Sequence, residues 1–555
     1  MRNIFLNVLL FMFSSILLFG CFGGGAEPDP TPTPTPSPST TITLGVDCSG
    51  NYCNSNGNSY VEGYGTGIWR AKNDVADSAT LNVELSNVAN KEITIVFTNE
   101  GDTDVTLPKI NVNTFLYSTA SNANTPLYST ASNDFIEASK KVIHFEKGFS
   151  NEELIKIYQR SLLSNEQPLK SIVAQAWSTD DTKEWLVLKP DNTIEKRKAT
   201  LKKQSASSNG RTINFWVEDD EYQLDKITSG ILNSIADKFL AVYPKIVDLA
   251  GEPWGPHGYI NEAIPANQQL NIVFANFDKN KTPYGVVGYF YSINNAIGQE
   301  YSNQSNQALV LFVDTETIYL GGSTGLSISL STTVHELTHA INFYQRKVIA
   351  LDPFDTFLNE LSAVLTEDLF SSQLHDSFNN NLIRYQNWLS SSANYNKDFA
   401  KWASEDGTTN YNIAGSFGAY LLRQYGINFY KTLFKTSGNL SAADVKASSL
   451  YILDKAIKTY DGKGLGGALQ RWGAGISLFR YETPNSYGYP EYSDSGFYLQ
   501  PFYGDEFSNI RKLPTSSPSV LSAHAHFPFL RKISQSTFKE SFTVPRNVSV
   551  TVIVK

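Results

Sequence analysis

The stretch Thr333-Val-His-Glu-Leu-Thr-His-Ala340 decides how the rest of the chain is interpreted. It places His335 and His339 four residues apart, with Glu336 between them. Residues four apart lie on one face of an α-helix, so both imidazoles can reach the same metal ion. Glu336 projects from a neighbouring part of that surface, where it can take a proton from a water molecule activated by the metal. The stretch therefore predicts a helix that carries part of a zinc site.

Two histidines need a third protein ligand to hold a catalytic zinc ion. A third histidine six residues after His339 is excluded, because that position is Gln345. The downstream methionine that accompanies such a histidine is also missing, since the two methionines are Met1 and Met12. The remaining standard option is a glutamate on a following helix. Glu360 lies 21 residues after His339, and we expect it to be the third ligand.

A second carboxylate lies on the same predicted helix. Glu367 follows Glu360 by seven residues, which is two turns along one face. Only one of the two can easily coordinate the metal. We expect Glu367 to hold a ligand imidazole through the ring N–H that does not face the metal.

The H-E-x-x-H motif and the later Asn359-Glu360 pair resemble the gluzincin metallopeptidases, and Phe357–Asp368 resembles their hyicolysin-type family. The resemblance covers residues 211–480. It implies an α+β, thermolysin-like domain with one catalytic zinc ion, and a protein or peptide substrate. The residues that it assigns are the zinc ligands His335, His339 and Glu360, the general base Glu336, and Glu367 as a residue that supports a ligand.

Amide hydrolysis also needs a donor that stabilises the oxyanion, usually Tyr or His. Tyr411 and Tyr420 flank a segment that resembles the Tyr-x-x-Gly helix start of aminopeptidase-type gluzincins, except that Tyr411 stands four residues before Gly415. Of the two tyrosines, we select Tyr411. The Gly-x-Met-x-Asn signature of aminopeptidases is absent, which favours an endopeptidase.

The N-terminus is typical of a bacterial lipoprotein. Arg2 precedes the apolar run Ile4–Gly20, and Leu18-Phe-Gly-Cys21 resembles a lipobox, in which the cut falls before a cysteine that is then acylated. A membrane-spanning anchor is the alternative, since this run is just long enough for one. The proline-rich residues that follow favour extended polyproline II and predict a semi-rigid tether.

These features predict a protein that is held to a bacterial cell membrane or outer membrane by lipid, with its folded part outside the cytoplasm and exposed at the surface. In that oxidising compartment we expect Cys48 and Cys53 to form a disulfide, with two free thiols as the alternative. The formal charge of −9 and the lack of a long Lys/Arg block argue against a nucleic-acid partner. The short basic run over 196–203 predicts a solvated loop or edge strand.

Periodicity and composition divide the chain into five parts. They are a signal peptide over 1–20, a tether over 21–41, a β-rich, sandwich-like region over 42–210, a metallopeptidase domain over 211–487 and a small β-rich unit over 488–555. The main competing hypothesis is a surface-exposed binding or adhesion lipoprotein that keeps the peptidase fold without activity.

Within the metallopeptidase part, strand patterns precede the motif and helical patterns follow it. The pattern over 224–242 predicts a helix that Pro244 ends or kinks. Ser329 or Ser331 is expected to cap the helix that carries the motif.

Overall fold

The computed structural model describes most of the chain after the expected tether. The described residues are 40–112, 138, 141–144, 176–259, 262–298, 301–375, 379–402, 407–436, 445–480, 482–502 and 506–555. The expected signal peptide, Cys21 and nearly all of the tether lie outside these ranges. They therefore stay predictions.

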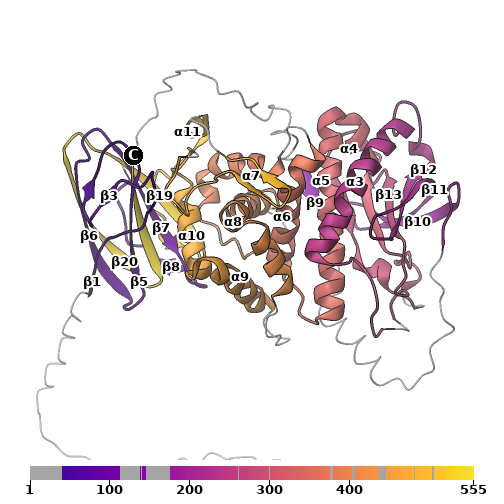
Figure 1. Cartoon of the computed structure of the whole chain (residues 1–555), viewed down its shortest axis with the longest axis horizontal. Helices are drawn as coiled ribbons and strands as arrows, with labels where there is room; N and C mark the ends of the chain where they lie inside the picture. The colour runs from indigo at the N-terminus through magenta and orange to yellow at the C-terminus, as the bar shows by residue number, and fades with distance from the viewer. Residues whose placement is uncertain are drawn as a thin grey trace, which may run out of the picture. The chain divides into compact units, whose positions relative to one another are not determined.

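A β-sandwich of two sheets forms the β-rich part (Figure 1). Both sheets bury their inner faces in one apolar cluster, to which Leu81 contributes from one sheet and Phe97 from the other. The first sheet contains β1 (Thr40–Ile42), β3 (Ser55–Asn56), β4 (Tyr60–Val61), β6 (Ser78–Ser86) and β20 (Thr537–Pro545). The second sheet has the order β19 (His526–Lys532), β7 (Glu92–Asn99), β21 (Val548–Val554), β5 (Gly67–Asn73) and β2 (Gly45–Val46).

The C-terminal strands do not form the separate unit expected over 488–555. β21 lies in the middle of the second sheet, where it pairs with both β7 and β5. Phe97 from the N-terminal region contacts Phe542, with ring centroids 5.6 Å apart. Alternation along a strand shows which face is buried but not which strand is its neighbour, so periodicity alone could not reveal this pairing. One sandwich is therefore built from both ends of the described chain.

The remaining short strands pair locally. β8 (Val105–Thr106) pairs with β18 (Val520–Leu521), which again joins the two ends of the chain. β16 (Tyr492–Asp494) and β17 (Phe497–Leu499) form an antiparallel pair. The ring of Phe497 packs against Phe370 of the helical body, with centroids 5.4 Å apart.

The middle of the described chain contains a seven-stranded mixed sheet (Figure 1). Its order is β10 (Thr182–Leu188), β11 (Ile194–Ala206), β12 (Thr212–Glu218), β13 (Leu270–Ala275), β15 (Val310–Asp314), β14 (Gly285–Phe290) and β9 (Val142–His144). β10 and β11 precede residue 211, so the expected boundary there divides this sheet and is corrected by the structure. The basic run lies on β11, where Arg197 pairs with Glu218 and Lys203 with Asp237.

Helices form the rest of the body. They are α3 (Ser229–Ala250), α4 (Thr315–Leu320), α5 (Gly322–Asn342), α6 (Thr356–Leu374), α7 (Asn380–Leu389), α8 (Gly407–Lys435), α9 (Val445–Asp461), α10 (Gly464–Ala474) and α11 (Glu506–Ile510), with a π-helical segment, η4, over Phe343–Ile349. α3 continues through Pro244 to Ala250, with Gly251 as its C-cap, so of the two predicted effects of Pro244 the end of the helix is wrong and the kink stays a prediction. The buried side chains of Tyr243 and Ile246 on either side of the proline hold this part of the helix in the core.

The motif helix α5 begins before the two serines that were predicted to cap it. It begins at Gly322, so Ser329 and Ser331 lie inside it rather than at its start. Ser331 instead hydrogen-bonds His375 at 2.9 Å. α5 packs against β14, where Gly288 leaves room for the helix: a Cβ there would lie 3.5 Å from Glu336 Cγ and closer still to Thr332. A larger residue at 288 would push the strand away from the motif.

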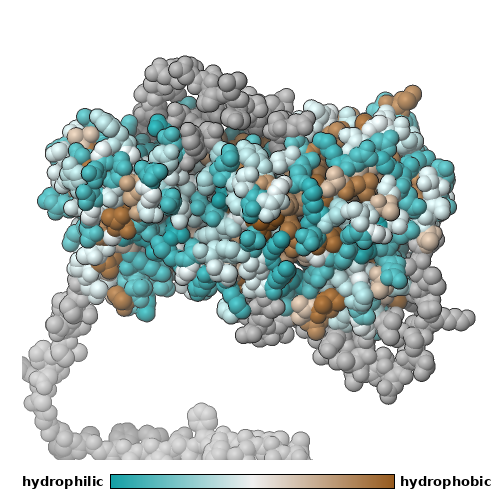
Figure 2. Space-filling model, in the orientation of Figure 1, coloured by the Kyte–Doolittle hydropathy of each residue, from teal (hydrophilic) through white to brown (hydrophobic). Residues whose placement is uncertain are grey.

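The face shown in Figure 2 is mostly hydrophilic, with apolar patches interrupted by polar residues. Within the ranges that the structure describes, no helix combines the length and apolar character needed to cross a bilayer.

Candidate metal centre

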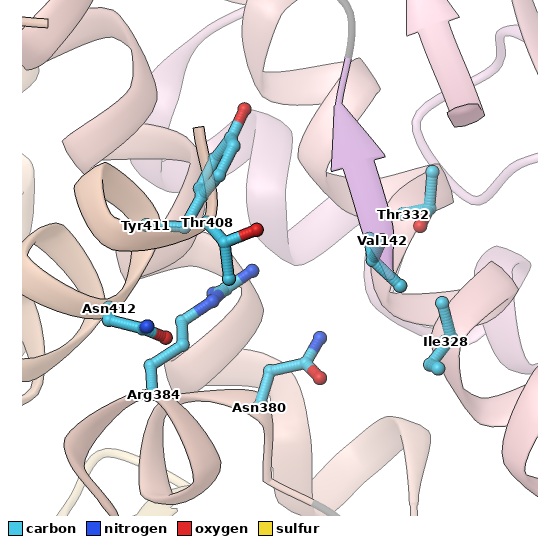
Figure 3. A pocket seen from close by; sticks show the side chains of 8 residues that line it. All are labelled: Val142, Ile328, Thr332, Asn380, Arg384, Thr408, Tyr411 and Asn412. Atoms are coloured by element: carbon cyan, nitrogen blue, oxygen red, sulfur yellow. The ribbon is translucent and has the colours of Figure 1, made fainter. Parts of the chain in front are cut away.

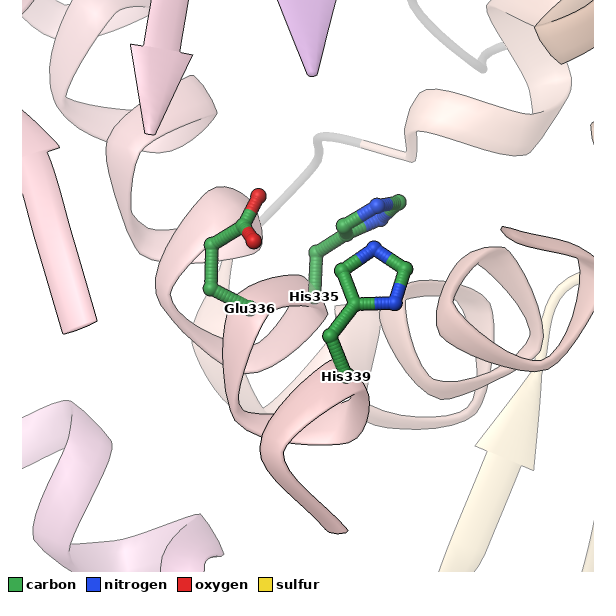
Figure 4. Close-up of side chains that lie close together, drawn as sticks. All are labelled: His335, Glu336 and His339. Carbon is green, nitrogen blue, oxygen red and sulfur yellow. The ribbon is translucent and has the colours of Figure 1, made fainter. Parts of the chain in front are cut away.

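The two motif histidines lie side by side on α5 (Figure 4). Their ring centroids are 4.7 Å apart and the ring planes are nearly perpendicular, at 81°. Both side chains are buried. The helical spacing therefore brings the two imidazole rings next to each other, as the sequence predicted.

Glu360 of α6 faces both histidines. Its Oε2 lies 3.2 Å from His335 Nε2, and its Oε1 lies 3.6 Å from His339 Nε2. Two contacts between α5 and α6 hold this arrangement, because the Asn342 side-chain amide donates to Asn359 Oδ1 at 2.7 Å and to Ser362 Oγ at 2.8 Å. The long-range partner that the sequence suggested is therefore brought to the histidine pair.

The two distances from Glu360 to the imidazole nitrogens are compatible with ligands that share one metal ion. Zinc bonds of about 2.0–2.1 Å put neighbouring ligand atoms about 3.3–3.4 Å apart, which matches the 3.2 and 3.6 Å observed. The ligand atoms of His335, Glu336 and His339 also lie within 4.8 Å of one another. Glu360 stays the expected third donor, because its oxygens lie 3.2 and 3.6 Å from the two imidazole nitrogens, whereas Glu336 Oε2 accepts the Phe290 N–H.

Glu336 is oriented by the sheet. Its Oε2 accepts a hydrogen bond of 2.8 Å from the backbone N–H of Phe290, the last residue of β14. Figure 4 shows its carboxylate beside the imidazoles but on a separate part of the helix surface. That placement suits a base that acts on a water molecule held next to the histidines.

Glu367 lies two turns further along α6 and contacts the other side of His335. Its Oε1 is 2.7 Å from His335 Nδ1, so Glu360 and Glu367 contact opposite nitrogens of one ring. A carboxylate at Nδ1 fixes the ring orientation and leaves Nε2 on the side of Glu360, where a metal ion could bind. The structure thus places Glu367 where the sequence predicted it.

Two residues of α7 hold Glu367 in turn. Arg384 donates to Glu367 Oε1 at 3.0 Å, and the Asn380 side-chain amide donates to Oε2 at 2.6 Å. Arg384 can reach this position because Gly415 of α8 has no side chain: a Cβ there would collide with Arg384. Arg384 and Asn380 were not predicted from the sequence, because their spacing from the motif carries no recognisable signal.

Tyr411 enters the site from α8. Its hydroxyl donates to Glu360 Oε2 at 2.7 Å, and its ring centroid is 6.0 Å from that of His335. Tyr420, the other tyrosine considered, donates to the Ser486 carbonyl at 3.1 Å. Of the two tyrosines, Tyr411 is therefore the one that the structure brings to the histidine pair.

The neighbouring groups of the centre shift one another's pKa values. Burial opposes ionisation of His335, but the hydrogen bonds to Glu360 and Glu367 raise its pKa above the ordinary value. Burial likewise works against the Glu360 carboxylate, yet the charge of His339 and the hydrogen bond from His335 hold its pKa well below the ordinary value. Burial raises the pKa of Tyr411 well above its ordinary value, and the negative charge of Glu360 is the second cause of this shift. Glu360 is thus an anion and Tyr411 a neutral donor at neutral pH.

A narrow cavity adjoins the centre (Figure 3). Its walls come from β9, α5, α7 and α8, and its lining residues are Val142, Ile328, Thr332, Asn380, Arg384, Thr408, Tyr411 and Asn412. Arg384 is the charged residue among the described residues that line this cavity.

The predicted cysteine pair lies in the sandwich region, away from the motif in sequence. Cys48 and Cys53 are joined as a disulfide, which closes a five-residue separation. This pair has no part in the centre.

Comparison with known proteins agrees with the geometry. Residues 191–555 match the model of the peptidase M30 family, and residues 47–112 match a domain of unknown function (DUF8571). The family match supports a peptide hydrolase. The chain belongs to the peptidase M30 family, the hyicolysin family whose members are metallopeptidases.

Other comparisons add little. No curated protein matches the chain. A listed solved structure is Legionella pneumophila aminopeptidase A in complex with aspartic acid, at 10% identity and a TM-score of 0.30. The match covers 91% of this chain and 58% of that chain, so this chain spans less than two thirds of its length.

The contact between Glu367 and His335 leads to a prediction on metal affinity. Glu367→Gln removes the charge at Nδ1 and leaves Arg384 without its anion, so we expect Zn²⁺ to bind about 10- to 100-fold more weakly. Competition with a chromogenic chelator measures the Kd. Glu84→Gln, at an exposed position of β6, is the matched control and should leave the Kd unchanged. An unchanged Kd in Glu367→Gln would contradict the role assigned to Glu367.

Proposed function

We propose that this M30 peptidase is a zinc-dependent endopeptidase of the gluzincin class, with the thermolysin-like arrangement expected from the motif. The observation that carries the proposal is that Glu360 lies 3.2 Å from His335 Nε2 and 3.6 Å from His339 Nε2, with Glu336 beside the histidine pair. We assign the first three as ligands of one zinc ion and Glu336 as the general base.

When bound, zinc supplies Lewis-acid activation of a water molecule and of the substrate carbonyl. Glu336, aligned by the Phe290 N–H, takes the proton of the attacking water and passes it to the leaving amine. Tyr411 stays protonated and donates a hydrogen bond to the oxygen on which negative charge develops. In the structure that donor points to Glu360, so it has to turn from the carboxylate to the substrate.

The cavity lining supports an endopeptidase over an aminopeptidase. An enzyme that removes N-terminal residues needs carboxylates to bind the substrate's α-ammonium group. The described lining contains Arg384 and no Asp or Glu. The three carboxylates of the centre already contact the histidines, Tyr411, Arg384, Asn380 or the Phe290 N–H. A substrate that runs past the site, without a free amine bound in it, fits this lining better.

The N-terminal signal supports an extracytoplasmic location. We propose that Cys21 carries the lipid and that the proline-rich tether holds the peptidase off a bacterial membrane, where it meets protein or peptide substrates.

Glu336→Gln tests the general base. The amide cannot take the proton, so we expect casein cleavage to fall about 10²- to 10⁴-fold while bound zinc stays near one per chain. Cleavage is measured by release of a fluorescent label, and zinc by elemental analysis. Equal cleavage by both proteins would show that the motif is not the catalyst. Absence of stoichiometric zinc from the purified wild-type protein would favour the alternative, an inactive binding lipoprotein.

Tyr411→Phe tests the oxyanion donor. Loss of the hydroxyl should lower kcat about 10²- to 10³-fold with little change in KM, because the bond to the substrate oxygen forms in the transition state. Tyr420→Phe is the matched control, since its hydroxyl donates to Ser486 and not to the centre. Steady-state kinetics on a fluorogenic peptide separate the two constants. A loss confined to KM, or an equal loss in both variants, would remove Tyr411 from this role.

Cys21→Ser tests the lipid anchor. The variant cannot be acylated, so we expect it to move from the membrane fraction to the soluble fraction when expressed in a bacterium. The double variant Cys48→Ser/Cys53→Ser retains Cys21 and should stay with the membrane. Retention of Cys21→Ser in the membrane fraction would point instead to the apolar run as a spanning anchor.

A further inference from the structure

The outer edge of the large sheet is filled by a short strand from far upstream. β9 runs parallel to β14, with Val142 opposite Gly285 and Ile143 opposite Val286. The Gly285 N–H donates to the Lys141 carbonyl at 2.9 Å. β14 pairs with β15 on its other side, so β9 occupies the edge of β14 that would otherwise be open.

That edge belongs to the strand nearest the centre. Phe290 of β14 donates its N–H to Glu336, and Gly288 lies against the motif helix. An extended peptide that adds to a sheet edge uses its main chain for affinity and its alternate side chains for specificity. On β14, such a peptide would lie beside Glu336. β9 therefore occupies the position from which an extended substrate backbone could approach the general base.

With β9 in place, the cavity at this edge is too narrow for a substrate. Val142 of β9 lines the cavity opposite Tyr411, as Figure 3 shows. The cavity has a volume of about 20 Å³, which is room for about one water molecule. Glu336 is fully buried, and Glu360 is 2% exposed. A polypeptide cannot reach these groups unless something moves.

β9 has the properties of a removable element. It lies outside residues 191–555, the part that matches the peptidase family. The contacts that the structure describes for it are three residues paired with β14, the half-buried Val142, and Ala138, which packs with Val287, Ile328 and Ile383. Short edge pairing of this kind opens at lower free energy than the sheet interior.

We infer that Ala138 and Lys141–His144, here called the β9 segment, are a built-in competitor of the substrate. The segment occupies the edge of β14 and keeps the centre closed, and an extended polypeptide enters by replacing it. The inference rests on the proposed peptidase function. It defines the substrate class as an unfolded or extended segment able to pair as a strand.

The first experiment weakens the segment in the full-length chain. Val142→Pro/Ile143→Pro removes two consecutive N–H groups, so at least one donor to the ladder is lost. We expect KM for labelled casein to fall about tenfold with kcat within twofold, because an intramolecular competitor acts at high effective concentration. Lys141→Ala is the control, since Lys141 contributes its carbonyl to β14 and its side chain is exposed. A KM that is unchanged or raised in a folded double variant overturns the inference.

The second experiment locks the segment in place. Ile143→Cys/Val286→Cys joins register partners on neighbouring strands, whose Cα spacing suits a disulfide. The oxidised, zinc-loaded protein should cleave casein at least about tenfold more slowly than the reduced protein. Reduction should restore the rate, and wild type is treated in parallel. Full cleavage by the locked form overturns the inference even if the proline variant fails to fold.

Hydrogen exchange separates this inference from the proposed function. In Glu336→Gln, the amides of β14 should exchange faster when the proline pair is present and become protected again when casein is added. If wild type is zinc-loaded but cleaves nothing, the proposed function fails, and these exchange rates still decide whether the β9 segment and a polypeptide compete for the edge. Slow exchange in the proline variant without casein would show that the segment does not cover β14.

Discussion

The centre depends on one imidazole held between two carboxylates of a single helix. Glu360 and Glu367 are seven residues apart on α6, and they contact opposite nitrogens of His335. Because seven residues span two helical turns, the distance between them is set by helix geometry alone. The orientation of His335 is therefore correct only if α5 and α6 pack in register, which the bonds from Asn342 to Asn359 and Ser362 ensure.

Burying so many charged groups is costly unless each one is paired. Glu367 would be an uncompensated anion without Arg384 and Asn380, and Glu360 is balanced by the histidines and Tyr411. The members of this buried network polarise one another, so the loss of one group leaves a buried charge in its partner. This explains why Arg384 must pass so close to Gly415: the close approach of α7 and α8 brings its cation into the core.

The motif and its nearest neighbours in sequence were predictable, because they obey helical periodicity. His335, Glu336, His339, Glu360 and Glu367 all take their positions from two helices whose patterns are visible in the residues. The polar residues that hold them were not predictable: Phe290 acts through its backbone, and Arg384 comes from a separate helix. The start of α5 was also misplaced, because a helix can begin at Gly322 without a side-chain cap when its buried face packs on a sheet.

The overall architecture also combines features that were predictable from the sequence with features that were not. Local pattern was enough to predict strands, helices and the exclusion of the three-histidine zinc class, since each rests on residue type and spacing. Only the tertiary structure decided that β19, β20 and β21 return to the N-terminal sandwich, that β10 and β11 extend the large sheet, and that β9 closes its edge. The reason is physical: side-chain periodicity determines which face of a strand is buried, whereas the identity of its hydrogen-bonding neighbour depends on chain topology and long-range packing.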